Sequence, residues 1–105
     1  MTTYVVMSDL ATNYNEFMGI VHLDAKIVGN VIQRFRRERG FSQEVLSGFA
    51  GIGRTHLSAI ECGDRKPTLE TFFRISEALE VKTSDLFSAI EKEIYSSGSC
   101  GNKSL

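Results

Sequence analysis

Residues 42–62 have the sequence SQEVLSGFAGIGRTHLSAIEC, which contains two short segments with apolar residues at helical spacing. The segments are separated by the three residues Gly51-Ile52-Gly53. Ser42 is a favourable N-cap for the first segment, and Gly51 can adopt the left-handed conformation that ends it. Two short helices joined by a three-residue turn with glycine are typical of a helix-turn-helix unit. The residues expected to point inward are Val45, Leu46, Phe49 and Ala50 in the first helix, and Leu57 and Ile60 in the second.

A longer helix is predicted before this unit, between Asp24 and Gly40. Asp24 can cap its start, and Gly40 can end it in the left-handed conformation. Arginines near its end interact favourably with the negative pole of the helix dipole. Its apolar residues recur at helical spacing, at Ile27, Val28, Val31, Ile32 and Phe35.

Two more helices are predicted after the unit. Thr68 can cap the fourth helix, since Pro67 blocks helical continuation from the loop before it, and Thr83 or Ser84 can cap the fifth. No alternating apolar run of strand length occurs between residues 24 and 95, so we predict an all-α fold of five helices. The apolar residues expected to point inward are Leu69, Phe72, Phe73, Ile75, Ala78 and Leu79 in the fourth helix, and Leu86 and Phe87 in the fifth.

A single domain is predicted over residues 24–95, since 105 residues with 42% hydrophobic composition can bury one core. Residues 1–23 lack a clear amphipathic repeat and are expected to be an arm or extension. Residues 96–105 are rich in Ser, Gly and Asn and are expected to be a flexible tail. Neither a membrane-spanning run nor a signal-peptide pattern occurs, so we expect a cytoplasmic protein.

The sequence carries no motif for a metal or for catalysis. Cys62 and Cys100 are far apart and share no metal-ligand spacing with His22 and His56. No nucleophile–base motif, phosphate loop or evident pair of carboxylates occurs either. We therefore expect no cofactor, no small-molecule ligand and no enzymatic activity.

Charge is distributed unevenly along the chain, whose formal net charge is −1. Residues 24–66 contain eight Lys and Arg against five Asp and Glu, whereas residues 67–95 contain three against six. The basic segment coincides with the predicted helix-turn-helix unit, which favours nucleic acid as the partner.

Residues 27–87 resemble the Cro/CI-type helix-turn-helix family, also called the XRE family, without gaps. This resemblance implies a compact five-helix, phage-repressor-like domain that binds double-stranded DNA, with its recognition helix at about residues 54–62 in the major groove. It also implies a bacterial or phage origin. The matching residues are Phe35-Arg36, Gly40-Phe41-Ser42-Gln43-Glu44, Leu46, Gly51-Ile52, residues 54–61, Gly63, Lys66-Pro67-Thr68-Leu69, Leu79-Glu80-Val81 and Asp85-Leu86-Phe87.

The resemblance also implies roles for individual residues. Gln43 is expected to support the recognition helix as well as to contact phosphate, and Arg36 and Glu61 are expected to form an internal salt bridge. Base contacts are expected from Arg54, Thr55, His56, Ser58 and Ala59, and phosphate contacts from Ser42, Gln43, Arg65 and Lys66.

Four residues depart from the family pattern. Ser47 and Gly48 lie where alanine and a helix-favouring polar residue, respectively, are usual, and Gly53 replaces the usual Ser or Thr cap of the recognition helix. Cys62 replaces a polar residue beside the groove, where it is either an inert helix-end residue or a thiol sensor.

A homodimer is expected, because half-sites one helical turn apart are normally bound by two-fold symmetric proteins. The candidate interface residues are Ile90, Ile94 and Tyr95 of the fifth helix, although these could instead close the core of the monomer. Three regulator types fit the pattern: a restriction–modification controller, a phage repressor, and an antitoxin that binds both a toxin and its own operator.

Overall fold

The computed structural model describes residues 22–103, with side chains through residue 96, and contains five α-helices in this range. The predicted extension at residues 1–23 lies outside this range except for its last two residues. All described secondary structure is helical, in agreement with the predicted all-α fold. No helix in this part of the chain is both long and apolar enough to span a bilayer. The helices are α2 (Ala25–Glu38), α3 (Gln43–Ala50), α4 (Arg54–Cys62), α5 (Leu69–Leu79) and α6 (Thr83–Lys103).

The helix ends follow the capping signals of the sequence. The side chains of Asp24, Ser42 and Thr68 each accept a hydrogen bond from a backbone N–H in the first turn of the following helix. Gly51 and Gly63 end α3 and α4 in the left-handed conformation. The prediction for α6 is wrong in detail: Thr83 is already its first residue, and the Thr83 hydroxyl lies 2.6 Å from the Ser76 hydroxyl of α5.

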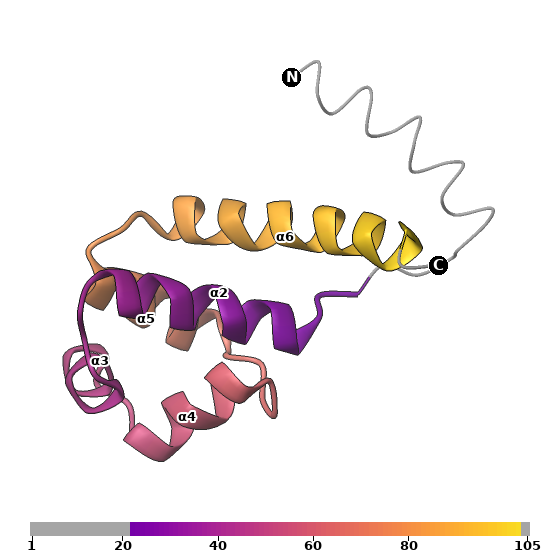
Figure 1. Ribbon diagram of the computed structural model, residues 1–105. Helices are drawn as coiled ribbons and strands as arrows, with labels where there is room; N and C mark the ends of the chain where they lie inside the picture. Colours follow the sequence, from indigo (N-terminus) through magenta and orange to yellow (C-terminus); the bar gives the residue numbers. More distant parts are fainter. Residues whose placement is uncertain (1–21, 104–105) are drawn as a thin grey trace.

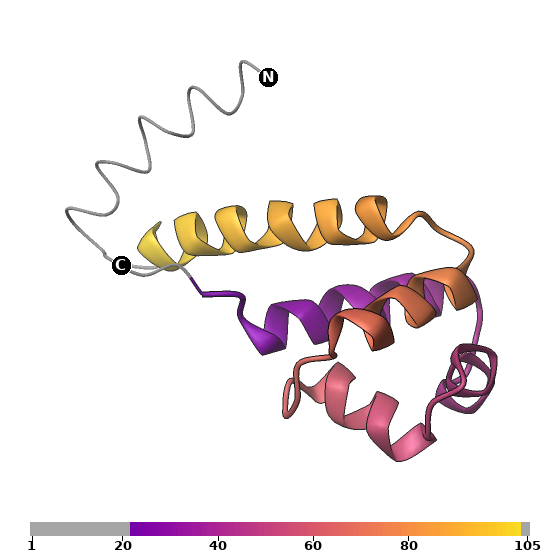
Figure 2. The ribbon, with the colours of Figure 1, turned by 180° about the vertical axis from the view of Figure 1, so that it is seen from behind.

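The helices form a layered arrangement in which α2 and α5 lie between α6 on one side and α3 and α4 on the other (Figures 1 and 2). The middle position of α2 follows from its contacts, since it packs against both α4 and α6. Apolar side chains from every helix meet in one core, at Val28, Val31, Ile32, Leu46, Ala50, Leu57, Ile60, Phe72, Ile75, Leu79, Leu86 and Ile90.

Four residues of α3 and α5 that were predicted to point inward are exposed instead. On α3 the core covers the flank of Leu46 and Ala50, so that Val45 and Phe49 face solvent. On α5 it covers Phe72 and Ile75, so that Leu69 and Phe73 face solvent. Successive residues of a helix are about 100° apart, so adjacent apolar residues can lie on flanks that the neighbouring helices do not cover.

The predicted assignment of residues in α6 also needs correction. Ile90 was expected to face a partner, but it is fully buried in the monomer's own core one turn after Leu86. Phe87 was expected to complete that core, yet it is 41% exposed. Ile94 is half-buried against the core and Tyr95 is exposed.

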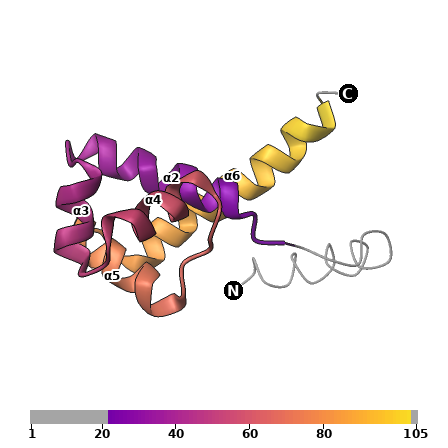
Figure 3. The same cartoon turned by 90° about the horizontal axis from the view of Figure 1, so that it is seen from below.

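The last part of α6 projects beyond the other four helices (Figure 3). The helix α6 extends to Lys103, into the segment from residue 96 that was predicted to be a tail.

Candidate nucleic-acid interface

The recognition-helix candidate α4 is anchored by one side and free on the other. Leu57 and Ile60 are fully buried, one turn apart, and face α2 and the core. Arg54 and Thr55 at the start of the helix are exposed. The other predicted base-contact residues, His56, Ser58 and Ala59, are half-buried. A helix with a buried inner face and polar groups at its exposed N-terminus can enter a major groove.

The start of α4 lacks a side-chain cap, as the glycine at position 53 predicts. Gly53 has an extended backbone, and a Cβ atom at this position would meet no atom within 4 Å. The first N–H groups of α4 therefore have no side-chain partner at the cap, and such groups at a helix N-terminus attract anions.

The predicted phosphate-contact residues lie in two groups, one at the start of α3 and one in the loop that follows α4. Ser42 and Gln43 are at the start of α3, where Ser42 is exposed and Gln43 is half-buried. The Ser42 hydroxyl accepts a hydrogen bond from the Val45 N–H at 3.0 Å. Arg65 and Lys66 are exposed in the loop that follows α4.

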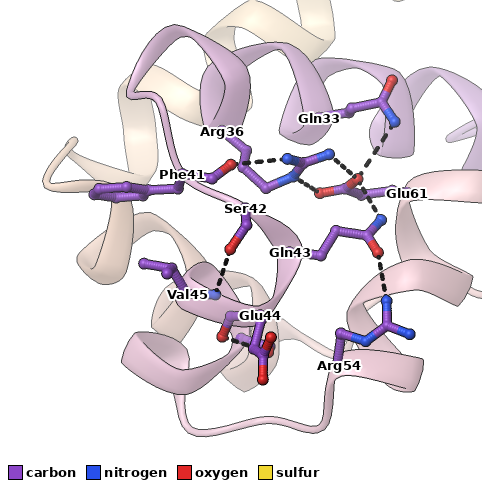
Figure 4. Close-up of polar contacts among 10 residues, drawn as sticks. Gln33, Arg36, Phe41, Ser42, Gln43, Glu44, Val45, Arg54 and Glu61 are labelled. Atoms are coloured by element: carbon purple, nitrogen blue, oxygen red, sulfur yellow. Dashed lines mark hydrogen bonds and ion pairs between the residues drawn. The ribbon is translucent and has the colours of Figure 1, made fainter.

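The predicted salt bridge between Arg36 and Glu61 is present and buried (Figure 4). The Glu61 side chain is fully buried and that of Arg36 is 9% exposed. Arg36 donates from Nε to Oε2 at 2.7 Å and from Nη2 to Oε1 at 2.9 Å, which makes the pair bidentate. A third bond, from Arg36 Nη1 to the Phe41 carbonyl at 2.8 Å, ties the pair to the segment between α2 and α3.

The environment of Arg36 favours its charged form. Hydrogen bonding to Glu61 raises the pKa of Arg36, burial opposes this rise, and the negative charge of Glu61 adds to it. Because the ordinary pKa of arginine is already far above neutrality, the guanidinium stays charged and the ion pair persists across the physiological pH range.

Two glutamines also converge on Glu61. Gln43 Nε2 donates to Glu61 Oε1 at 2.9 Å, and Gln33 Nε2 donates to the same oxygen at 3.4 Å. The Gln43 carbonyl oxygen lies 3.4 Å from Arg54 Nη1 (Figure 4). Gln33 was not predicted as a site residue, because nothing in the sequence around it distinguishes it from other polar residues on α2.

A close approach of α2 to the end of α4 was also missed. Gly29 is buried within α2, and a Cβ atom there would lie 2.3 Å from the Ile60 carbonyl oxygen and 2.6 Å from that of Glu61. Gly63, which ends α4, makes a second close approach to α2, because a Cβ atom at Gly63 would collide with Lys26. A glycine inside an otherwise regular helical pattern was the available signal.

An apolar groove of about 630 Å³ lies beside the loop that follows α4. Lys66 and Pro67 form one wall, and the first turns of α5 and α6 contribute Leu69 and Phe87. Leu69 is 82% exposed and Phe87 is 41% exposed, so the groove presents large apolar side chains to solvent.

The fold and this arrangement of α3 and α4 together define a helix-turn-helix DNA-binding domain. A family model described as "Helix-turn-helix" matches residues 32–86. The chain therefore belongs to the helix-turn-helix family, which confirms the resemblance to Cro/CI-type (XRE) regulators and places it among DNA-binding transcriptional regulators.

Several relatives are restriction–modification control proteins. The control protein C.MunI of Mycoplasma sp is 40% identical over 72 residues, which span 67% of this chain and 97% of that protein. The controller protein C.AhdI of Aeromonas hydrophila has a similar structure, with 26% identity and a TM-score of 0.59, over 62% of this chain and 98% of that one. The controller protein C.Esp1396I, solved as a tetramer with its natural 35 base-pair operator, is 33% identical with a TM-score of 0.65, over 72% and 99% of the two chains.

Proposed function

We propose that this helix-turn-helix protein regulates transcription as a homodimer that binds a palindromic operator, in the manner of a restriction–modification controller. Each protomer inserts α4 into the major groove of one half-site. The protein acts in the cytoplasm by binding alone, without a catalytic step. The similarity to the control protein C.MunI supports the controller-like role, because the match spans 97% of that protein and 67% of this chain.

The observation that carries the proposal is the two-sided character of α4. Leu57 and Ile60 fix the helix to the core, while Arg54 and Thr55 lie free at its N-terminus. In this proposal the exposed start of α4 contacts base edges, because an α-helix fits the width of the major groove. Ser42 and Gln43 at the start of α3, with Arg65 and Lys66 in the loop that follows α4, contact the flanking phosphates.

The proposal predicts different effects for two basic residues. Replacing Arg54 by alanine should reduce discrimination between the operator and a duplex with one changed base pair by roughly 10- to 100-fold, because arginine can bind guanine through two hydrogen bonds. Replacing Lys66 by alanine should weaken binding to all duplexes alike, because a phosphate contact carries no sequence information. It should also reduce the steepness of the plot of log affinity against log salt concentration by about one unit. Fluorescence anisotropy titrations at three salt concentrations measure both effects. Equal losses for both variants on every duplex would contradict the assigned roles.

The operator itself can be found by selection. Binding of a random duplex library at physiological salt, followed by sequencing of the bound pool, should enrich a palindrome whose half-sites are about one helical turn apart. Weak, salt-sensitive binding without any enriched sequence would contradict the proposal and favour the alternative of an antitoxin that needs a protein partner.

The apolar groove is the better candidate for the dimer surface than the predicted face of α6. Ile90 is not available to a partner, whereas Leu69 and Phe87 are exposed at the groove. A two-fold contact requires one surface patch to be complementary to itself, and here a protruding leucine borders a hollow on the same face. Since Lys66 also lines the groove, such a contact would bring the two loops that follow α4 close to the symmetry axis.

A charge in this groove is expected to separate the protomers. Leu69→Glu should yield a monomer in sedimentation velocity and lower operator affinity roughly 100-fold, because the second half-site no longer binds at high effective concentration. Phe49→Glu is a matched control, since Phe49 is 66% exposed but does not line the groove, and it should leave the dimer intact. A dimer of unchanged stability for Leu69→Glu would exclude this surface, and a monomeric unmodified protein at micromolar concentration would contradict the homodimer.

A further inference from the structure

We propose that Lys66 links dimerisation to DNA binding: its charge opposes the association of two free protomers, and an operator phosphate that binds it removes this opposition. This inference rests on the proposed function, in which the apolar groove is the dimer surface and Lys66 contacts phosphate. It goes further, because the operator then acts as a ligand that strengthens the dimer and not only as the target of a dimer already formed.

The groove carries one positive charge and no negative charge among the described residues that line it. Its lining consists of apolar side chains, the hydroxyl residues Thr83 and Ser84, and Lys66. Lys66 is exposed, and no ion pair in this part of the chain includes it. The carboxylate of Glu70, in the first turn of α5, pairs instead with Arg74 at 3.0 Å. A solvated lysine thus belongs to an otherwise uncharged surface.

A two-fold contact through this groove doubles the charge. The same patch of each protomer meets its copy, so Lys66 of both protomers comes to the contact. Two like charges near a protein surface repel each other. Each ammonium group also loses part of its hydration when apolar side chains such as Leu69 and Phe87 close around it. Burial of those apolar side chains therefore favours the dimer, and the two lysines oppose it.

The same lysine belongs to the loop that carries candidate phosphate contacts. The start of this loop is fixed to α4, because the N–H groups of Asp64 and Arg65 donate to the Ala59 carbonyl oxygen at 2.9 and 3.3 Å. Lys66 directly follows these two residues, so its backbone moves with α4 when that helix enters the major groove. A phosphate bound by Lys66 there supplies the negative charge that the dimer surface lacks.

Thermodynamic linkage gives the consequence of this arrangement. If phosphate at Lys66 removes the repulsion, DNA strengthens the dimer by the same factor by which dimerisation strengthens phosphate binding. Removal of the charge must then change two equilibria in opposite directions: the free dimer becomes tighter, and the complex with DNA becomes weaker. A lysine that only contacts phosphate would change the second equilibrium alone.

Arg65 provides a matched control. It is an exposed cation next to Lys66 and another candidate phosphate contact, but it does not line the groove. Arg65→Met should weaken DNA binding and leave the free dimer unchanged. Lys66→Arg retains the charge and should leave both equilibria close to those of the unmodified protein.

The test measures both equilibria on the full chain. Sedimentation velocity over a concentration series gives the dissociation constant of the free dimer, and fluorescence anisotropy gives the affinity of the dimer for the selected operator. Lys66→Met should tighten the free dimer roughly threefold to tenfold, as expected for two like charges brought together near a protein surface, and should weaken operator binding. An increase in NaCl from about 50 mM to about 500 mM should tighten the unmodified dimer and leave the Lys66→Met dimer within about twofold, because salt screens the repulsion.

Each outcome bears on the inference. An unchanged or weaker free dimer for Lys66→Met would overturn it. Equal tightening by Arg65→Met would assign the effect to the net charge of the protomer and would overturn it too. Leu69→Glu separates this failure from that of the proposed dimer surface. If Leu69→Glu yields a monomer while Lys66→Met leaves the dimer unchanged, the surface stands and the inference alone fails. If Leu69→Glu leaves the dimer intact, the surface and the inference fail together.

Discussion

Replacement of Glu61 by leucine is expected to lower the free energy of unfolding by about 3–5 kcal/mol, because it leaves the Arg36 charge buried without its partner. The Glu61 side chain is fully buried and accepts hydrogen bonds from both Arg36 and Gln43, so its removal leaves both donors without this acceptor. Urea denaturation followed by far-UV circular dichroism measures the change.

Two controls separate burial of a lone charge from loss of an ion pair. The double variant Arg36→Met with Glu61→Leu should recover much of the lost stability, since apolar residues of similar volume often replace a buried pair at little cost. Glu70→Gln breaks the exposed pair of Glu70 with Arg74 and should cost less than about 0.5 kcal/mol. A double variant as unstable as the sum of the two single variants would contradict this account.

Gly29→Ala is expected to destabilise the domain by about 3 kcal/mol even though alanine is the better helix former. The added Cβ atom would lie 2.3 Å from the Ile60 carbonyl oxygen and 2.8 Å from the Glu61 carbonyl carbon. These are backbone atoms of α4, so relief requires the two helices to move apart. We expect a fall in melting temperature of more than about 10 °C, measured by circular dichroism.

Gly48→Ala is the matched control for this prediction. Gly48 also lies inside a helix, but a Cβ atom there would meet nothing within 4 Å. Alanine at this position should raise the free energy of unfolding by about 0.5–1 kcal/mol, because it removes the conformational freedom of glycine from the unfolded chain. The two substitutions are therefore expected to have opposite signs. Similar effects of both would show that helix propensity, and not the close approach of α2 and α4, decides the role of Gly29.

Gly29 also bears on DNA binding, because its contact sets the distance between α2 and α4. Glu61 lies at this contact and accepts hydrogen bonds from Arg36 of α2 and from Gln43 of α3. A displaced α4 would move Arg54 relative to α3. The stability of the domain and the position of its candidate base-contact residues thus depend on the same few atoms.

The sequence by itself determined the helices and most of their ends. Ser42 and Thr68 cap α3 and α5 with side-chain hydrogen bonds, and Gly51 ends α3 in the left-handed conformation, as predicted. These features depend on groups within about four residues along the chain, so local sequence contains the information. The pair of Arg36 and Glu61, 25 residues apart, was found through the family resemblance and not through any local pattern.

The tertiary structure alone decided which apolar flank of each helix is covered. Ile90 and Phe87 are both apolar and close together on α6, yet the first is fully buried and the second is exposed at the groove. It also decided that Gln33 and Gln43, from different helices, meet at one carboxylate. Burial and convergence depend on how separate helices pack, and residues distant in sequence set that packing. A pattern of helical spacing identifies candidates for the core and the site, but only the neighbouring helices select among them.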